Sequence, residues 1–178
     1  MNIVIIGPPG SGKTTQAQLL ADSLGAPHLN TGDLMYFASQ GADETARAVK
    51  ESMEKGQMVD DEIAEKLIKQ YFEDHKDSKN IVIDGYPRTI AQAEAQIFPI
   101  DRVYYIKVGD EESAKRLSSR GRADDSGVVI NERLKVYHEE TEPILEFYRE
   151  KGILEEINGE REIDEVSKDL ELRTIDKR

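Results

Sequence analysis

Cysteine is absent from this 178-residue sequence. The chain therefore forms no disulfide bond and offers no thiolate to a zinc ion. Histidine is scarce as well, and the three residues, His28, His75 and His138, are scattered without the short spacing that metal ligands show. We therefore expect neither a zinc site nor a histidine metal centre.

Long apolar runs and an excess of positive charge are also missing. No apolar stretch approaches the roughly 20 residues that span a bilayer, and the net charge of -12 argues against nucleic-acid binding, which needs a basic surface. A strand is predicted almost at Met1, which leaves no space for a signal peptide. We expect a single α/β domain in the cytoplasm, with neither a membrane nor a nucleic acid as partner.

Residues 7–14 read GPPGSGKT and fit the phosphate-binding pattern G-x-x-x-x-G-K-S/T. They follow residues 3–6, a β-branched apolar stretch that predicts a buried parallel strand. They precede residues 15–24, whose apolar positions have helical spacing and end before Gly25. In this context the loop N–H groups and the helix dipole bind phosphates, Lys13 reaches the β- and γ-phosphates, and the Thr14 hydroxyl faces a magnesium ion. The protein is expected to bind a nucleotide polyphosphate.

Further strands and helices alternate along the chain. Residues 80–84 and 102–108 predict two more buried strands, and residues 26–30 and 153–157 predict weaker ones, the latter at an edge. Amphipathic helices separate them. Thr31 is expected to cap one of these and Thr89 to cap another, the one that contains Gln92, and Pro143 is expected to kink or split a third. Alternation of this kind indicates a parallel sheet with right-handed crossovers.

Polar residues after the strands suggest the chemistry. Asp84 ends a buried strand, where a Walker-B acid holds a magnesium-bound water. Arginines at turns are candidates for bidentate phosphate contacts; they are Arg88, Arg116, Arg120, Arg122 and Arg133. No catalytic triad is visible, and in-line phosphoryl transfer requires mainly positioning and charge neutralisation.

Several separated motifs together resemble the adenylate kinase family, in its short-lid form, over essentially the whole chain. They are residues 7–15, 28–33, 84–89 with Gln92, 120–125 and 133–138. The resemblance implies a P-loop NTPase-type fold, a five-stranded parallel sheet flanked by helices. It also implies a core domain of residues 1–29, 60–120 and 128–178, a small helical subdomain for the nucleoside monophosphate at residues 30–59, and a short lid at residues 121–127.

The resemblance also implies an ATP and magnesium site. Asp84 matches the acid that orders the magnesium water, while the hydroxyl of either Thr14 or Thr15 meets the ion, because Thr14 stands where the family usually has glycine. Arg122 and Arg133 match the arginines that touch the transferring phosphoryl group, and Arg120 belongs to the same catalytic set as Lys13 and Arg88. The expected ATP-binding residues are Gly10, Ser11, Gly12, Lys13, Thr14, Thr15, Arg116 and Arg120.

For AMP, Arg88 matches the arginine on the phosphate, and Gln92 the side chain that reads adenine. Thr31 matches the threonine beside adenine, where the similar UMP/CMP kinases usually carry alanine. Tyr36 departs from the family, which places a phosphate-binding arginine there. The expected AMP-binding residues are Thr31, Tyr36, Met53, Val59, Gly85, Arg88 and Gln92.

The resemblance implies a reversible, Mg²⁺-dependent reaction, ATP + AMP = 2 ADP, by a monomeric enzyme whose ligands are ATP, AMP and ADP. Two alternatives stay open at this point. One is a nucleoside-monophosphate kinase with a shifted base preference, for UMP or CMP. The other is a nucleotide-binding regulator with weak turnover, which only Tyr36 supports.

Overall fold

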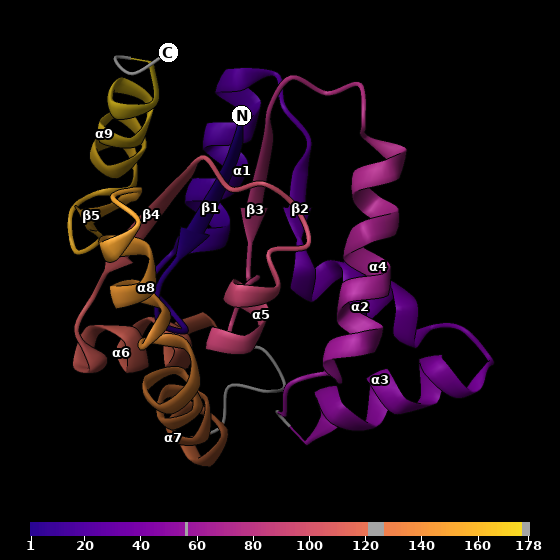
Figure 1. The fold of residues 1–178 in the computed structure, drawn as a ribbon. Helices are drawn as coiled ribbons and strands as arrows, with labels where there is room; N and C mark the ends of the chain where they lie inside the picture. Colours follow the sequence, from indigo (N-terminus) through magenta and orange to yellow (C-terminus); the bar gives the residue numbers. More distant parts are fainter. Residues whose placement is uncertain (56, 121–126, 176–178) are drawn as a thin grey trace.

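The computed structural model describes residues 1–55, 57–120 and 127–175. Within these residues a parallel sheet of five strands has the order β2-β3-β1-β4-β5 (Figure 1). The strands are β1 Asn2–Ile6, β2 His28–Asn30, β3 Ile81–Asp84, β4 Arg102–Lys107 and β5 Leu154–Asn158. The P-loop-type α/β fold and the edge position of the last strand are as the sequence predicted.

Helices connect the strands and cover both faces of the sheet (Figure 1). They are α1 Lys13–Leu24, α2 Thr31–Ser39, α3 Glu44–Glu54, α4 Asp61–Asp74, α5 Ile90–Ala95, α6 Asp110–Arg120, α7 Gly127–Val136, the π-helix η1 Tyr137–Thr141, α8 Ile144–Glu150 and α9 Ile163–Ile175. In the described residues no helix has the length and apolar character of a membrane span.

Strand β1 shows how the sequence builds the core. Ile3 and Ile5 face a cluster that includes Leu20 of α1 and Leu170 of α9. The alternate residues Val4 and Ile6 join the other cluster, with residues of α4, η1 and α8. Because side chains alternate across a strand, a continuous apolar run packs on both faces. β1 is thereby fixed in the middle of the sheet, and the loop that follows it has a rigid base.

Helices α2 and α3 project beside the sheet together with α4 (Figure 1). A small apolar cluster of their own, Met35, Val49 and Ala64, holds them together. The prediction that Thr31 caps α2 is wrong: Asn30 is the cap, and its Oδ1 accepts hydrogen bonds from the N–H groups of residues 32 and 33. Thr31 is the first residue inside the helix, so its hydroxyl is available for another contact.

The helical segment before β5 is interrupted as Pro143 predicted. α7 passes into η1, and α8 begins directly after Pro143. Proline provides no N–H for the helical ladder, so a regular α-helix cannot continue through it. The proposed lid, including Arg122, lies outside the described residues except for Gly127, which begins α7.

Candidate active site

The loop after β1 leads directly into α1 at the centre of the sheet. Gly10 and Gly12 have φ of 84° and 85°, and a Cβ at Gly10 would lie 2.5 Å from the Ser113 carbonyl oxygen. Glycine adopts this backbone without strain, and its lack of a side chain permits the close approach. Gly12 is the N-cap of α1 and makes no side-chain cap, so the N–H groups of the first turn are available to an anion. This geometry suits a phosphate chain.

Thr14 and Asp84 meet beside this helix N-terminus. The Thr14 hydroxyl donates a hydrogen bond to Asp84 Oδ2. Asp84 is only 2% exposed, and among the described residues its Oδ1 has no hydrogen-bond partner. A buried carboxylate oxygen without a partner is costly unless a ligand, ion or water uses it. The donor set of one hydroxyl and one carboxylate fits Mg²⁺, which keeps several waters and takes its other ligands from nucleotide phosphates.

Lys13 lies in a crowded cationic environment. Its Nζ is 3.3 Å from the Pro8 carbonyl oxygen. Desolvation lowers the pKa of Lys13 to about 8; the Asp84 carboxylate opposes this shift, and the charges of Arg88, Arg133 and Arg120 add to it. Desolvation also lowers the pKa of Arg88, although its side chain opens into a cavity. Positively charged side chains thus gather at one place, which suits an anionic ligand such as a phosphate.

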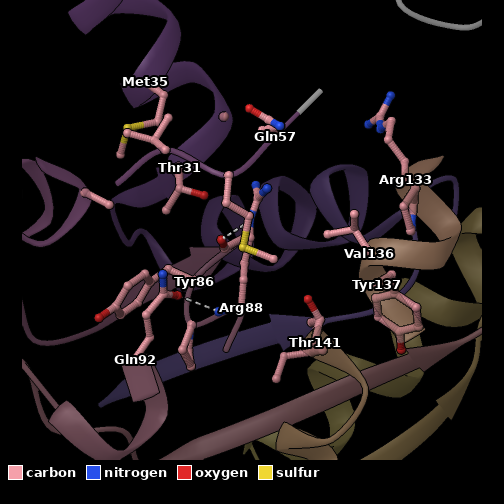
Figure 2. Close-up of a pocket in the computed structure, with 18 of the residues that line it drawn as sticks. Thr31, Met35, Gln57, Tyr86, Arg88, Gln92, Arg133, Val136, Tyr137 and Thr141 are labelled. Atoms are coloured by element: carbon pink, nitrogen blue, oxygen red, sulfur yellow. Dashed lines mark hydrogen bonds between the residues drawn. The ribbon is translucent and has the colours of Figure 1, made fainter. Parts of the chain in front are cut away.

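Lys13, Arg88 and Arg133 line one end of a cavity of about 530 Å³. In Figure 2, Thr31 and Met35 lie on one side of the cavity, and Arg133, Val136 and Tyr137 lie on the other. Of the predicted AMP-binding residues, those that line it are Thr31, Met53, Val59, Gly85, Arg88 and Gln92. Its size is in the range of small-molecule sites.

Gly85 brings Thr31 and Arg88 together. The Thr31 hydroxyl donates to the Asp84 carbonyl oxygen at 3.1 Å, and Arg88 Nε donates to the Gly85 carbonyl oxygen at 2.6 Å. Gly85 has φ of 88°, and a Cβ there would lie 2.3 Å from Thr31 Oγ1. The close approach of these side chains therefore depends on glycine at this position.

The next turn carries Gln92. Thr89 caps α5, as predicted, with its Oγ1 accepting from the Gln92 N–H at 3.2 Å. Gln92 Oε1 accepts from the Arg88 N–H at 2.7 Å, and the side chain is 4% exposed (Figure 2). The cap and this second bond fix a buried amide in the cavity wall.

The remaining predicted residues are placed less centrally. Arg116 donates to Glu112 Oε1 at 2.8 Å and to the Gly159 carbonyl oxygen at 3.0 Å. Arg120, at the end of α6, is close enough to Lys13 to lower its pKa. Thr15 is exposed in the first turn of α1, whereas Ser11 is buried and its Oγ has no partner within the described residues.

Tyr36 is not among the described residues that line the cavity. Its side chain is 54% exposed and makes an edge-on contact with Phe37, with ring centroids 5.9 Å apart. Tyr36 therefore does not belong to the described cavity lining that Lys13, Arg88 and Arg133 share.

Several lining residues were not predicted as site residues. Tyr137 and Thr141 reach the cavity from η1, and Tyr86 reaches it from the turn after β3. Both side chains are buried; the Tyr86 hydroxyl has no hydrogen-bond partner among the described residues, and the Tyr137 hydroxyl lies beside Tyr105. Tyr137 belongs to an amphipathic segment of the sequence, but apolar spacing does not separate a core tyrosine from a cavity-lining one.

Comparison with known proteins agrees with this geometry. The family model described as "Adenylate kinase" matches residues 5–153. Adenylate kinase of Methanosarcina barkeri is 34% identical, with 96% of each chain covered. Those of Dehalococcoides mccartyi and Mycobacteroides abscessus are each 37% identical and cover 94% and 93% of this chain. The coverage reaches from the phosphate loop to the region of β5. This chain is a member of the adenylate kinase family.

Proposed function

We propose that this protein catalyses the reversible transfer of a phosphoryl group from ATP to AMP, giving two ADP. The main support is the position of Lys13, Arg88 and Arg133 around one end of a cavity whose other walls accept a nucleoside. Membership of the adenylate kinase family agrees with this reaction. The two alternatives, a shifted base preference and a regulator with weak turnover, have no specific support in the cavity.

In this mechanism a phosphate oxygen of AMP attacks the γ-phosphorus of ATP. A bond forms between that oxygen and phosphorus, and the bond to the β,γ-bridging oxygen breaks, leaving ADP on both sides. Lys13 and the N–H groups at the start of α1 neutralise the β- and γ-phosphates. Arg88 holds the AMP phosphate, and Arg133 approaches from the opposite wall. The residues contribute mainly orientation and charge, which are the main requirements of phosphoryl transfer.

Thr14 and Asp84 would hold Mg²⁺, in part through water. When bound, the ion neutralises charge on the β- and γ-phosphates. The buried Asp84 Oδ1 and the Thr14 hydroxyl fit this role because they lie beside the phosphate loop. Neither residue needs to exchange a proton with the nucleotide.

The proposed binding assignments follow the sequence predictions. The ATP site consists of residues 10–15 with Arg116 and Arg120. Arg122 is proposed as a catalytic residue from the sequence alone, because it lies outside the described residues. The AMP site consists of the six predicted residues that line the cavity. Tyr36 remains a prediction, because it is not among the described residues that line the cavity. We also propose that the enzyme is a monomer in the cytoplasm.

A coupled assay for ADP formation tests the function. We expect Mg²⁺-dependent turnover with ATP and AMP, and much slower turnover with CMP, UMP and GMP. Lys13→Met should abolish turnover while the protein still folds, because the glycine backbone sets the loop conformation. Equal rates with CMP or UMP would support the shifted preference instead. Nucleotide binding without turnover would support the regulator.

A further inference from the structure

The carboxamide of Gln92 makes a hydrogen bond at each end, one with a group that can only donate and one with a group that can only accept. Its Oε1 accepts from the Arg88 backbone N–H at 2.7 Å, and its Nε2 donates to Asp61 Oδ1 at 2.5 Å. A backbone N–H only donates, and a carboxylate only accepts. The two contacts therefore specify the same orientation of the amide independently. Asp61 belongs to the first turn of α4, 31 residues away from Gln92 in sequence.

Reversing the amide would place like groups against each other at both ends. The carbonyl oxygen would face the Asp61 carboxylate, and the NH₂ group would face the Arg88 N–H. Each contact would change from a hydrogen bond to a repulsion, and Gln92 is buried, so water cannot easily replace the lost bonds. The orientation is therefore strongly fixed, and Asp61 supplies the charged half of that restraint.

One hydrogen on Nε2 and one lone pair on Oε1 are left for a ligand in the cavity. Side by side, they match a base edge that carries a ring-nitrogen acceptor beside an amino donor. Adenine and cytosine have such an edge. Hypoxanthine, guanine and uracil present the reverse, a ring N–H donor beside a carbonyl acceptor. In the same pose these oxo bases would meet Gln92 donor to donor and acceptor to acceptor.

We infer that Asp61 is a specificity-determining residue, which makes the AMP site select amino bases over oxo bases by fixing the orientation of Gln92. Asp61 acts through Gln92 and needs no contact with the nucleotide. The inference rests on the proposed function to the extent that AMP is the occupant of this cavity. The orientation of the amide accounts for the choice of amino over oxo bases, and it makes no distinction between a purine and a pyrimidine.

Inosine monophosphate is the sharpest probe, because it differs from AMP only in replacing the amino group with a carbonyl and adding a proton at N1. The decisive variant is Asp61→Asn, whose side chain can donate as well as accept, so that only the Arg88 N–H still specifies the orientation of Gln92. The matched control is Asp60→Asn, one residue earlier. Asp60 caps α4 by accepting from the N–H groups of Glu62 and Ile63, and asparagine keeps that role while removing the same charge.

The measured quantity is the ratio of kcat/KM for AMP to that for inosine monophosphate, together with the Kd of each by calorimetry. We expect Asp61→Asn to lower this ratio by about tenfold or more, because a site built for one hydrogen-bond pattern rejects the other strongly. Asp60→Asn should leave it unchanged. Asp61 is exposed at the helix start, so the variant should fold, and its melting temperature checks this.

An unchanged AMP-to-inosine ratio in Asp61→Asn would overturn the inference, and so would an equal loss in Asp60→Asn. A loss of the same size for both nucleotides would also overturn it, since that indicates general damage to the site. Failure of the proposed function looks different: the wild-type protein would form no ADP from AMP. In that case the ratio of the Kd values for AMP and inosine monophosphate tests the inference without any kinetics. Wild-type protein that binds both monophosphates equally would refute it.

Discussion

The Thr14 hydroxyl donates a hydrogen bond to Asp84 Oδ2, which joins the first turn of α1 to the carboxyl end of β3. Thr15, the next residue, is exposed and has no such contact among the described residues. The sequence left open which of the two hydroxyls meets magnesium. The contact with Asp84 favours Thr14.

We therefore predict that Thr14→Val raises the Mg²⁺ concentration needed for half-maximal turnover by about tenfold or more, since removing a group that orients a metal site typically costs that much. Thr15→Val serves as the matched control and should leave this concentration unchanged, whatever it does to the KM for ATP. Magnesium titrations at saturating nucleotide measure both. The opposite pattern, with only Thr15→Val sensitive, would assign the ion to Thr15.

The second prediction concerns pH and ATP binding. Lys13 has a pKa of about 8 in the free protein, mainly because of desolvation. A bound polyphosphate favours the charged lysine and raises this pKa. Below about pH 7 the free and bound forms are both protonated, so the affinity does not depend on this group. As the pH rises through about 8, the free protein loses the proton and must regain it to bind ATP.

We therefore expect the affinity for ATP to fall above about pH 8, with a slope that approaches a tenfold loss per pH unit. In the same range, ATP binding should be accompanied by the uptake of a proton. Calorimetry in buffers with different ionisation enthalpies measures the uptake. Lys13→Met is the control and should bind ATP weakly, without this pH dependence. Proton uptake that persists in Lys13→Met would assign the titration to another group.

The sequence predicted the features that depend on neighbouring residues. The strand, glycine loop and helix at the start of the chain, Asp84 at a strand end and Thr89 as a helix cap are local patterns with a direct physical cause. Contacts between distant segments could not be predicted in this way. The hydrogen bond between Asp61 and Gln92 depends on how α4 packs near α5. In the sequence, an Asp at a helix start is sufficiently explained by its favourable interaction with the helix dipole.

Two further features of the site could not be predicted from local sequence patterns. Asn30 caps α2 in place of Thr31, and the Thr31 hydroxyl donates to the Asp84 carbonyl oxygen, a contact across 53 residues. Tyr137 reaches the cavity through η1, where the π-helical turn changes the direction of side chains relative to a regular helix. Pro143 predicted a break in the helix, but it did not predict the π-helical turn that precedes the break.

The third prediction concerns Gly85. An alanine there would have left-handed φ, and its Cβ would clash with the Thr31 hydroxyl and approach the Arg88 guanidinium. The strain costs about 1–2 kcal/mol, and the clash displaces two residues of the proposed AMP site. We expect Gly85→Ala to raise the KM for AMP by about tenfold or more, since displaced contacts of about 1.4 kcal/mol already give that factor.

Gly152→Ala is the matched control. Gly152 also has a left-handed φ, of 71°, but no atom lies within 4 Å of a Cβ built there. Both variants should therefore lose similar stability from backbone strain, as a denaturant titration measures, and only Gly85→Ala should lose affinity for AMP. Normal AMP kinetics in Gly85→Ala would show that Thr31 and Arg88 do not hold the monophosphate.

The last prediction concerns Tyr36, which stands where the resemblance to the adenylate kinase family implies a phosphate-binding arginine. A phenol offers one neutral hydrogen bond, whereas arginine makes charge-assisted and often bidentate contacts. Without such a contact, binding is weaker by on the order of 1.5–3 kcal/mol, or roughly ten- to a hundred-fold. We therefore expect a high KM for AMP beside an ordinary KM for ATP, and we expect Tyr36→Arg to lower the first selectively.

Phe37→Arg is the control for added positive charge, because Phe37 is 71% exposed and lies beside Tyr36 in α2. It should leave the KM for AMP nearly unchanged, because an exposed charge away from the site is screened by solvent. Arg47→Ala tests the alternative that α3 provides the phosphate contact. If Tyr36→Arg has no effect and Arg47→Ala weakens AMP binding, the contact has moved to Arg47. If neither matters, Arg88 alone binds the AMP phosphate, and the alignment of Tyr36 with the family's arginine has no functional meaning.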